Sequence, residues 1–344
     1  MFRDNTVFVI GAGASAEFGL PLGHQLLTLV KANCRFEVSG WTLISGVEEI
    51  YKAIVNRYTK HDDIIAAHLE AMGEINRAID FAGSIDEFIN RHGDDPIIAE
   101  VGKLQIAYAI SEAERSSHLS SISKHAETQI EWNTSETWMH TFAQLLFDGV
   151  KNGDVETVGN NITIICFNYD RCIELFLTDA IVKAFRNVPF DQAYKIVERM
   201  NIIHPYGSLG SLRHHTFGHR ATPQDIRAMS ENIVTWSESQ RSDITPKIQT
   251  AMSGASTVVF LGFAFAPQNM KLLSVQNSSP YDEQVCETFA TAYGYNSVIE
   301  DRLKTKILNL FSPVEYRINF DRVHIQYGMK CADFLKAHSM ALVN

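Results

Sequence analysis

The sequence predicts an α/β protein in which a parallel β-sheet is interrupted by a large helical insertion. Short β-branched apolar runs occur near the N-terminus and again after residue 160, as is typical of strands buried on both faces. A glycine-rich turn follows the first run, and apolar residues then recur at three- and four-residue spacing up to residue 155. We therefore expect residues 1–35 and 156–344 to form the sheet domain and residues 36–155 to form the insertion.

The first strand is expected at Val7–Ile10, directly before the turn Gly11-Ala12-Gly13-Ala14-Ser15, with a helix over Leu22–Lys31. Glycines permit positive φ and close backbone approach, so a phosphate could rest on bare N–H groups at the start of a helix. This βα unit predicts a Rossmann-like, nucleotide-binding sheet. The alternative is that the glycines only let the helix pack tightly. No acidic residue follows a clear second strand, which disfavours an ordinary dehydrogenase.

The insertion is expected to be mostly helical, with no convincing strand. Its helices are predicted at residues 48–55, 64–81, 97–114 and 136–150. Beyond it, strands are predicted at Asn161–Asn168, Asn201–His204 and Thr257–Gly262, and Ile233–Trp236 is either a strand or a loop edge. The C-terminal part is expected to contain helices at 171–185, 269–273, 299–310 and 332–341, and short strands at 314–318 and 323–326.

Composition excludes several classes of protein. The net charge of −10 without a long basic run argues against non-specific nucleic-acid binding. Five cysteines without a C-x-x-C pair favour reduced thiols and a cytoplasmic location. No run approaches the roughly 20 apolar residues that cross a bilayer, so we expect no membrane association. The chain enters its first strand within six residues, so no signal peptide is expected.

Polar side chains are expected where the later strands end. Asn168 and Asp170 follow a buried strand, and the carboxyl ends of parallel strands face the ligand crevice. An amide and a carboxylate there can bind ribose hydroxyls, although Asp170 could instead cap the next helix. His204 follows the next strand, and an imidazole titrates near pH 6.5, so it is either a general base or a satisfied strand-end histidine.

Four blocks together resemble one family. They are the opening G-A-G-A-S…G-L-P, Cys166-Phe-Asn-Tyr-Asp170, His204-Pro-Tyr-Gly-Ser-Leu-Gly210 and Val258–Phe265. In this order and spacing the chain is similar to divergent prokaryotic sirtuin-like proteins that act as NAD hydrolases in anti-phage defence. The resemblance covers roughly residues 6–30 and 160–273. The block Ser84-Ile-Asp-Glu-Phe-Ile89 also looks like one common in that family.

The resemblance assigns roles to these blocks. Asn168 and Asp170 match the Asn and Asp of the sirtuin Q-N-x-D motif, but Phe167 replaces the Gln. The sirtuin catalytic histidine directly precedes a glycine, whereas here Tyr206 precedes Gly207. Alternate residues of a strand point the same way, so both His204 and Tyr206 are expected to face the pocket, with His204 as the base.

Further positions complete the expected NAD site. The diphosphate is assigned to Ser15 and to the amides after Gly11, namely those of Ala12, Gly13 and Ala14. Gly262 and Phe263 are placed near the adenosine ribose, although Phe263 could equally belong to the core. Asp86, Glu87 and Asn90 share one helix, either on its surface or closing the pocket. The His-rich stretch Ser208–Ser230 is expected to be a loop beside the site and not a metal site.

The resemblance implies cleavage of NAD⁺ to nicotinamide and ADP-ribose, with no metal and no direct nucleic-acid partner. Because such an enzyme would harm its own cell, we expect it to be gated in a homo-oligomer or by a partner such as a HerA-type ATPase. The alternative is a non-catalytic subunit that binds NAD or ADP-ribose. A protein deacylase is disfavoured, because no paired cysteines are present and Gly23-His24 replaces the sirtuin Phe-Arg.

Overall fold

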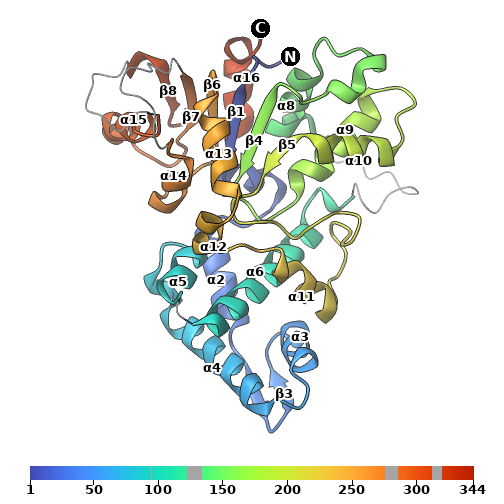
Figure 1. Cartoon of the computed structure of the whole chain (residues 1–344), viewed down its shortest axis with the longest axis vertical. Helices are drawn as coiled ribbons and strands as arrows, with labels where there is room; N and C mark the ends of the chain where they lie inside the picture. Colours follow the sequence, from blue (N-terminus) through green and yellow to red (C-terminus); the bar gives the residue numbers. More distant parts are fainter. Residues whose placement is uncertain (94, 122–133, 276–285, 312–319) are drawn as a thin grey trace.

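A parallel sheet forms the upper part of the molecule (Figure 1). The computed structural model describes residues 1–93, 95–121, 134–275, 286–311 and 320–344. Within them the sheet has six strands in the order β5-β4-β1-β6-β7-β8. The strands are β1 (Thr6–Ile10), β4 (Ile162–Cys166), β5 (Asn201–Ile203), β6 (Thr257–Leu261), β7 (Glu287–Thr291) and β8 (Val323–Gln326). The prediction of an α/β fold with a Rossmann-like parallel sheet and a helical insertion is confirmed.

The register aligns the ends of the central strands. Ile10 of β1 pairs with Cys166 of β4 on one side and with Leu261 of β6 on the other. The residues that follow these three strands therefore leave the sheet at the same edge. Because the chain turns to opposite sides after β1 and β6, this is the crevice where open α/β sheets bind ligands.

The two faces of the sheet have separate cores. Phe8 and Ile10 of β1 pack with helices α8 (Trp138–Phe147), α9 (Cys172–Ala184), α10 (Phe190–Arg199) and α16 (Cys331–Leu342). Phe8 makes edge contacts with the rings of Phe2 and Phe142. Val7 and Val9 face the other side, toward α13 (Ile244–Ser253), α14 (Pro267–Leu273) and α15 (Glu300–Leu308). Every residue of β1 is buried, as the apolar run Val7–Ile10 predicts.

The lower part, which we call the helical lobe, carries most of the insertion (Figure 1). It contains α2 (Gly23–Asn33), α3 (Glu48–Arg57), α4 (Asp62–Ala78), α5 (Ile85–Arg91) and α6 (Pro96–Ser116). The expectation of no strand in this window is wrong, because β2 (Glu37–Ser39) and β3 (Thr42–Ser45) form a hairpin. Its strands are too short to produce a recognisable alternation, and Gly40 (φ 58°) makes the turn.

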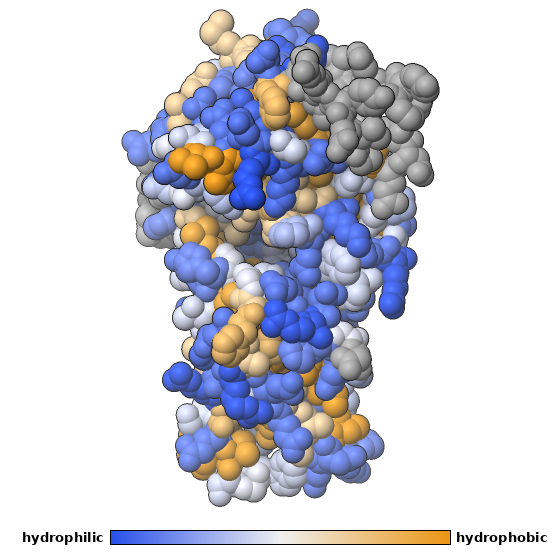
Figure 2. Space-filling model, turned by 90° about the vertical axis from the view of Figure 1, so that its left-hand side faces the viewer, coloured by the Kyte–Doolittle hydropathy of each residue, from blue (hydrophilic) through white to orange (hydrophobic). Residues whose placement is uncertain are grey.

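The hairpin lies at the lower end of the molecule, where Figure 2 shows hydrophobic surface. Trp41 and Ile44 are exposed there. In the described part of the chain, no helix is long and apolar enough to cross a membrane.

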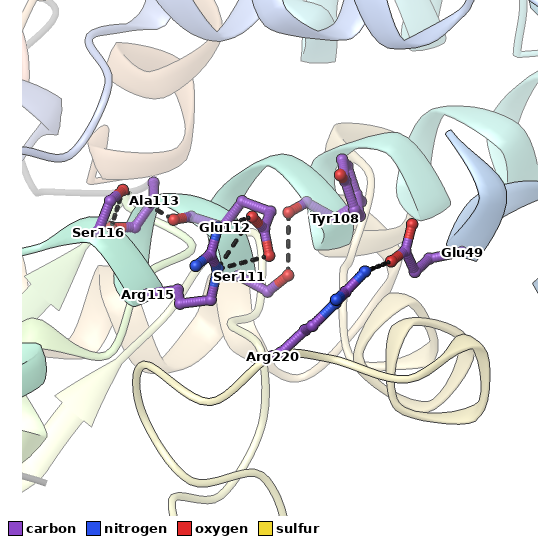
Figure 3. A network of polar contacts seen from close by, with 8 residues as sticks. All are labelled: Glu49, Tyr108, Ser111, Glu112, Ala113, Arg115, Ser116 and Arg220. Atoms are coloured by element: carbon purple, nitrogen blue, oxygen red, sulfur yellow. Dashed lines mark hydrogen bonds and ion pairs between the residues drawn. The ribbon is translucent and has the colours of Figure 1, made fainter. Parts of the chain in front are cut away.

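Two segments cross the expected domain boundaries. Helix α8, inside the 36–155 window, packs on α9 and α16 beside the sheet. Conversely α11 (Pro223–Glu231) and α12 (Trp236–Arg241) pack on the helical lobe, against α3, α5 and α6. The segment before α11 is also tied to the lobe, because Arg220 pairs with Glu49 of α3 at 2.7 Å (Figure 3). The chain therefore passes from the sheet to the lobe twice.

Several minor expectations also changed. Strand β7 was not predicted, and Ile233 forms only an isolated bridge with Gly207. Helix α11 occupies part of the stretch expected to be a loop. The strand expected at 314–318 lies outside the described residues.

Candidate functional site

A cavity of about 580 Å³ opens where β1, β4 and β6 end, against α2 and α5 of the helical lobe. Most of the predicted site residues line it, namely Gly11, Ala12, Gly13, Asn168, Asp170, Tyr206, Gly262 and Phe263. Ser15, His204 and Gly207 are not among the lining residues. The volume is typical of a pocket for a small molecule or cofactor.

The glycines pack the first turn against the loop after β6. The Gly13 amide donates to the Gly262 carbonyl at 2.9 Å, and a Cβ on Gly13 would lie 2.8 Å from the Gly262 Cα. Gly262 has φ 58°, and a Cβ there would lie 2.1 Å from the Ala14 nitrogen. The Ala14 amide donates to the Gly11 carbonyl at 2.9 Å. Two of the amides expected to hold phosphate are therefore engaged within the chain, and the tight-packing interpretation of the turn accounts for Gly13.

Asn168 is held rigidly at the end of β4. Its Nδ2 donates to the Gly11 carbonyl at 3.0 Å and to Ser15 Oγ at 2.8 Å. Both amide hydrogens are therefore used, which leaves Oδ1 as the atom that the side chain can offer to a ligand. Ser15 is 3% exposed, and it holds the Asn168 side chain through this hydrogen bond to its Oγ.

Asp170 serves as a helix cap and also lines the cavity. Its Oδ1 accepts from the Cys172 amide at 3.1 Å, at the start of α9. Burial raises the pKa of this carboxyl, and hydrogen bonds from Cys172 and Ser15 oppose the rise. The capping interpretation of Asp170 is thus geometrically satisfied, and the carboxylate is still within reach of a bound molecule.

His204 points away from the cavity. Its Nδ1 lies 3.1 Å from the Asn168 carbonyl oxygen, and its Nε2 lies 2.8 Å from Glu174 Oε1. Both partners are acceptors, so the ring donates from both nitrogens and is an imidazolium. Burial by itself would lower the pKa of His204, but the negative charge of Glu174 raises it well above the ordinary value.

Tyr206, two residues on, does reach the cavity. Its hydroxyl donates to Asn269 Oδ1 at 2.7 Å, and its ring meets Phe167 edge-on at 5.8 Å. His204 and Tyr206 were expected to point the same way, as alternate residues of a strand do. They do not, because β5 ends at Ile203. The Gly207 amide then donates to the His204 carbonyl at 3.1 Å, so these residues form a turn and not a strand. Gly207 has φ 69° and shapes this turn without lining the cavity.

Asp86, for which the sequence left open a helix surface or a place closing the pocket, lines the cavity. It lies in the first turn of α5, where the Ser84 hydroxyl caps the helix by accepting from the Glu87 amide at 3.0 Å. The Tyr169 hydroxyl donates to Asp86 Oδ1, and both residues line the cavity. Burial raises the pKa of Asp86 to about 6. The only sequence signal was the block Ser84–Ile89, whose helical spacing leaves open which face is covered.

Charged residues from both ends of the chain also border the cavity. Lys330, just before α16, is the basic group among them, and the His24 ring of α2 also lines the cavity. Glu17 accepts from the Trp138 amide and the Ala332 amide, both at 3.1 Å, and so caps α8 and α16 together. Tyr293 and Tyr295 border the cavity and are exposed.

The histidine-rich segment Ser208–Ser230 carries an ion-pair contact of its own. The His215 Nδ1 lies 3.4 Å from Asp225 Oδ1. Among the residues described, no three His, Cys, Asp or Glu side chains gather where they could hold a metal ion.

Comparison with family models, with curated proteins and with solved structures finds no match to this chain. The cavity is therefore the basis of the function proposed below.

Proposed function

We propose that this cavity binds NAD⁺ and that the chain hydrolyses it to nicotinamide and ADP-ribose. The observation that carries the proposal is the fixed Asn168 amide, tied to Gly11 and Ser15 at the edge where β1, β4 and β6 end. The strand order and the lining glycines support a dinucleotide at this edge. Lys330 would supply positive charge for its diphosphate, and the His24 ring could donate a hydrogen bond to it.

The chemistry follows from the leaving group. Nicotinamide departs as a neutral base from a cationic substrate, so the ribosyl carbon passes through an oxocarbenium-like state. Asn168 Oδ1 would orient a ribose hydroxyl and the attacking water, which places the reacting atoms before bond cleavage. Asp170 would accept from a ribose hydroxyl. In this cleavage step the protein acts on NAD⁺ through its side chains alone.

His204 takes a different role from the one first expected. An imidazolium that donates to Glu174 and to the Asn168 carbonyl cannot accept a proton at neutral pH. We assign it as a positioning residue that holds the backbone of Asn168. Tyr206, fixed by Asn269, takes the place in the pocket next to Gly207.

Asn168→Ala tests the proposal. It should abolish nicotinamide release and leave the fold intact. Asn201→Ala is the matched control, because Asn201 lies at the opposite end of the sheet, where it donates to Thr163 Oγ1. Nicotinamide is measured by chromatography over a range of protein concentrations. If Asn168→Ala turns over NAD⁺ within a few-fold of the parent chain, the assignment is wrong.

We further propose a gated cytoplasmic enzyme that is active in a homo-oligomer or with a partner such as a HerA-type ATPase. The reason is physiological, since unrestrained hydrolysis would deplete a central cofactor. Activity that rises steeply with protein concentration, or on addition of the products of neighbouring genes, is the expected result. Full turnover by an isolated monomer would refute the gate and leave the chemistry standing.

A non-catalytic subunit that binds NAD or ADP-ribose is the second candidate. The engaged ring of His204 favours it, because the residue expected to be the base does not reach the cavity. Equal NAD⁺ affinity and equal cellular toxicity of the parent chain and Asn168→Ala would decide for this function.

A further inference from the structure

The cavity contains a carboxylate that comes from the helical lobe and not from the sheet. Asp86 lies on α5, and its Oδ1 accepts a hydrogen bond from the hydroxyl of Tyr169. Tyr169 is the residue between Asn168 and Asp170. The side chain therefore contacts the strand-end motif from the helical lobe. Asn168 and Asp86 line the same cavity, so a ligand bound there can contact both.

Among the described residues two other carboxylates line the cavity, and each of them caps a helix. Glu17 uses Oε1 for the Ala332 amide and Oε2 for the Trp138 amide, so both oxygens cap helices. Asp170 caps α9 through the Cys172 amide. Tyr169 is the one side chain among the described residues that donates to Asp86, and it does so at Oδ1, which fixes the direction of the carboxylate and leaves Oδ2 facing no other side-chain donor.

We propose that Asp86 is the catalytic carboxylate of this site, facing the cationic nicotinamide riboside end of NAD⁺ and accepting the proton of the attacking water. This inference rests on the proposed hydrolase function. The C1′–N bond breaks, and its electron pair stays on nicotinamide. The water oxygen bonds to C1′, one water proton passes to the Asp86 carboxylate, and the proton is later released to solvent.

The surroundings of Asp86 suit both tasks. The low-dielectric wall formed by Tyr169 and Tyr206, 6% and 3% exposed, strengthens attraction between a carboxylate and a cation. A pKa of about 6 leaves the group ionised at pH 7 and near the value that makes proton transfer efficient. Glu87, the next residue, shares none of this, because it pairs with Arg91 at 2.7 Å on the helix surface.

The test compares Asp86→Asn with Glu87→Gln, which makes the same change of charge at the adjacent, surface-paired position. Asp86→Asn keeps the shape of the side chain and removes its charge. Affinities for NAD⁺ and NADH are measured by calorimetry, with both variants made in the Asn168→Ala chain to prevent turnover. NADH lacks the positive charge on the nicotinamide ring, so a carboxylate facing that ring prefers NAD⁺.

We expect the Asn168→Ala chain with Asp86 and Glu87 intact to bind NAD⁺ about tenfold or more tightly than NADH, a difference that corresponds to one close charge pair. The ratio should fall to near one in Asp86→Asn and stay unchanged in Glu87→Gln. In the chain that carries Asn168, Asp86→Asn should lower kcat by roughly 10²–10⁴, as for a lost general base, and should raise KM in step with the lost affinity for NAD⁺. Tyr169→Phe, which keeps the carboxylate, should preserve the preference for NAD⁺.

The outcomes separate the two proposals. An unchanged affinity ratio and unchanged kcat in Asp86→Asn, with nicotinamide still released, overturn the role of Asp86 and leave the hydrolase standing. A parent chain that prefers NAD⁺ through Asp86 but never cleaves it overturns the hydrolase and the proton transfer. A merely structural role for Asp86 would lower the affinity for both nucleotides equally, which also overturns the inference.

Discussion

Replacing Glu114 by Gln should destabilise the whole chain, because this residue belongs to a buried ion pair between the helical lobe and the sheet. The side chains of Arg171 and Glu114 are 2% and 1% exposed. Glu114 accepts from the Arg171 backbone amide at 3.0 Å, from Nε at 3.2 Å and from Nη2 at 2.5 Å. The remaining Nη1 donates to the His215 carbonyl. One guanidinium thus joins α6, the start of α9 and the segment before α11.

The expected cost follows from the burial of the pair. Removing one partner of a buried pair costs about 3–5 kcal/mol, because the other charge is left without compensation. Gln retains one acceptor oxygen, so we expect the lower end, about 3 kcal/mol. Whole domains are stable by about 5–15 kcal/mol, so the variant should fold but unfold at clearly lower denaturant concentration.

Urea unfolding followed by circular dichroism measures the difference, with Glu112→Gln as the control on the same helix. Glu112 pairs with Arg115 at the surface, where the side chains are 30% and 47% exposed, and this pair should contribute at most about 1 kcal/mol (Figure 3). Replacing both Glu114 and Arg171 by Leu should recover much of the lost stability. Equal destabilisation by the two Gln variants would refute the reasoning.

Three further predictions concern the site and its surroundings. Gly262→Ala should cost more than about 3 kcal/mol or prevent folding, since its Cβ would overlap the Ala14 nitrogen, whereas Gly153→Ala, with open space around it, should be nearly neutral in thermal unfolding. His204→Gln tests a pH dependence. Because the pKa of His204 is raised in the folded state, its contribution to the free energy of unfolding is fully present below about pH 6.5. The difference in unfolding free energy between the parent chain and the variant should shrink as the pH rises toward the folded-state pKa of His204. A constant difference between pH 6 and 10 would contradict the ion pair. NAD⁺ turnover should be the same in EDTA, and a loss that a divalent metal restores would point to the segment around His215.

The sheet and half of the site could be predicted because they depend on local sequence. Continuous apolar runs marked β1, β4 and β6, and the polar residues directly after β4 had to emerge at the sheet edge. Strand β7 was missed because Glu287-Thr-Phe-Ala-Thr291 is short and polar at both ends. Its burial comes from its neighbours β6 and β8, which the local sequence does not reveal.

The remaining site residues depend on tertiary packing. The side chain of His204 turned outward because the strand ended one residue earlier than expected, so the alternation of strand side chains no longer applied. Asp86 could be placed on a helix by its spacing, but only the packing of α5 against the strand-end motif shows that it enters the cavity. Gly13 was correctly placed at the turn, yet its contact with Gly262 joins segments almost 250 residues apart in sequence.

The position of β1 in the centre of the sheet has a consequence for how the chain folds during synthesis. This strand is made first, but its two partners begin only at Ile162 and Thr257. At about 5–20 residues per second, a ribosome needs on the order of 10–30 s to reach β4. Through that time Val7–Ile10 is an apolar strand with two open edges, which is the state most prone to aggregation. The contacts among α2, α4 and α6 are closer in sequence and can form in the interval. The helical lobe can therefore cover β1 until β4 and β6 have been synthesised and pair with it.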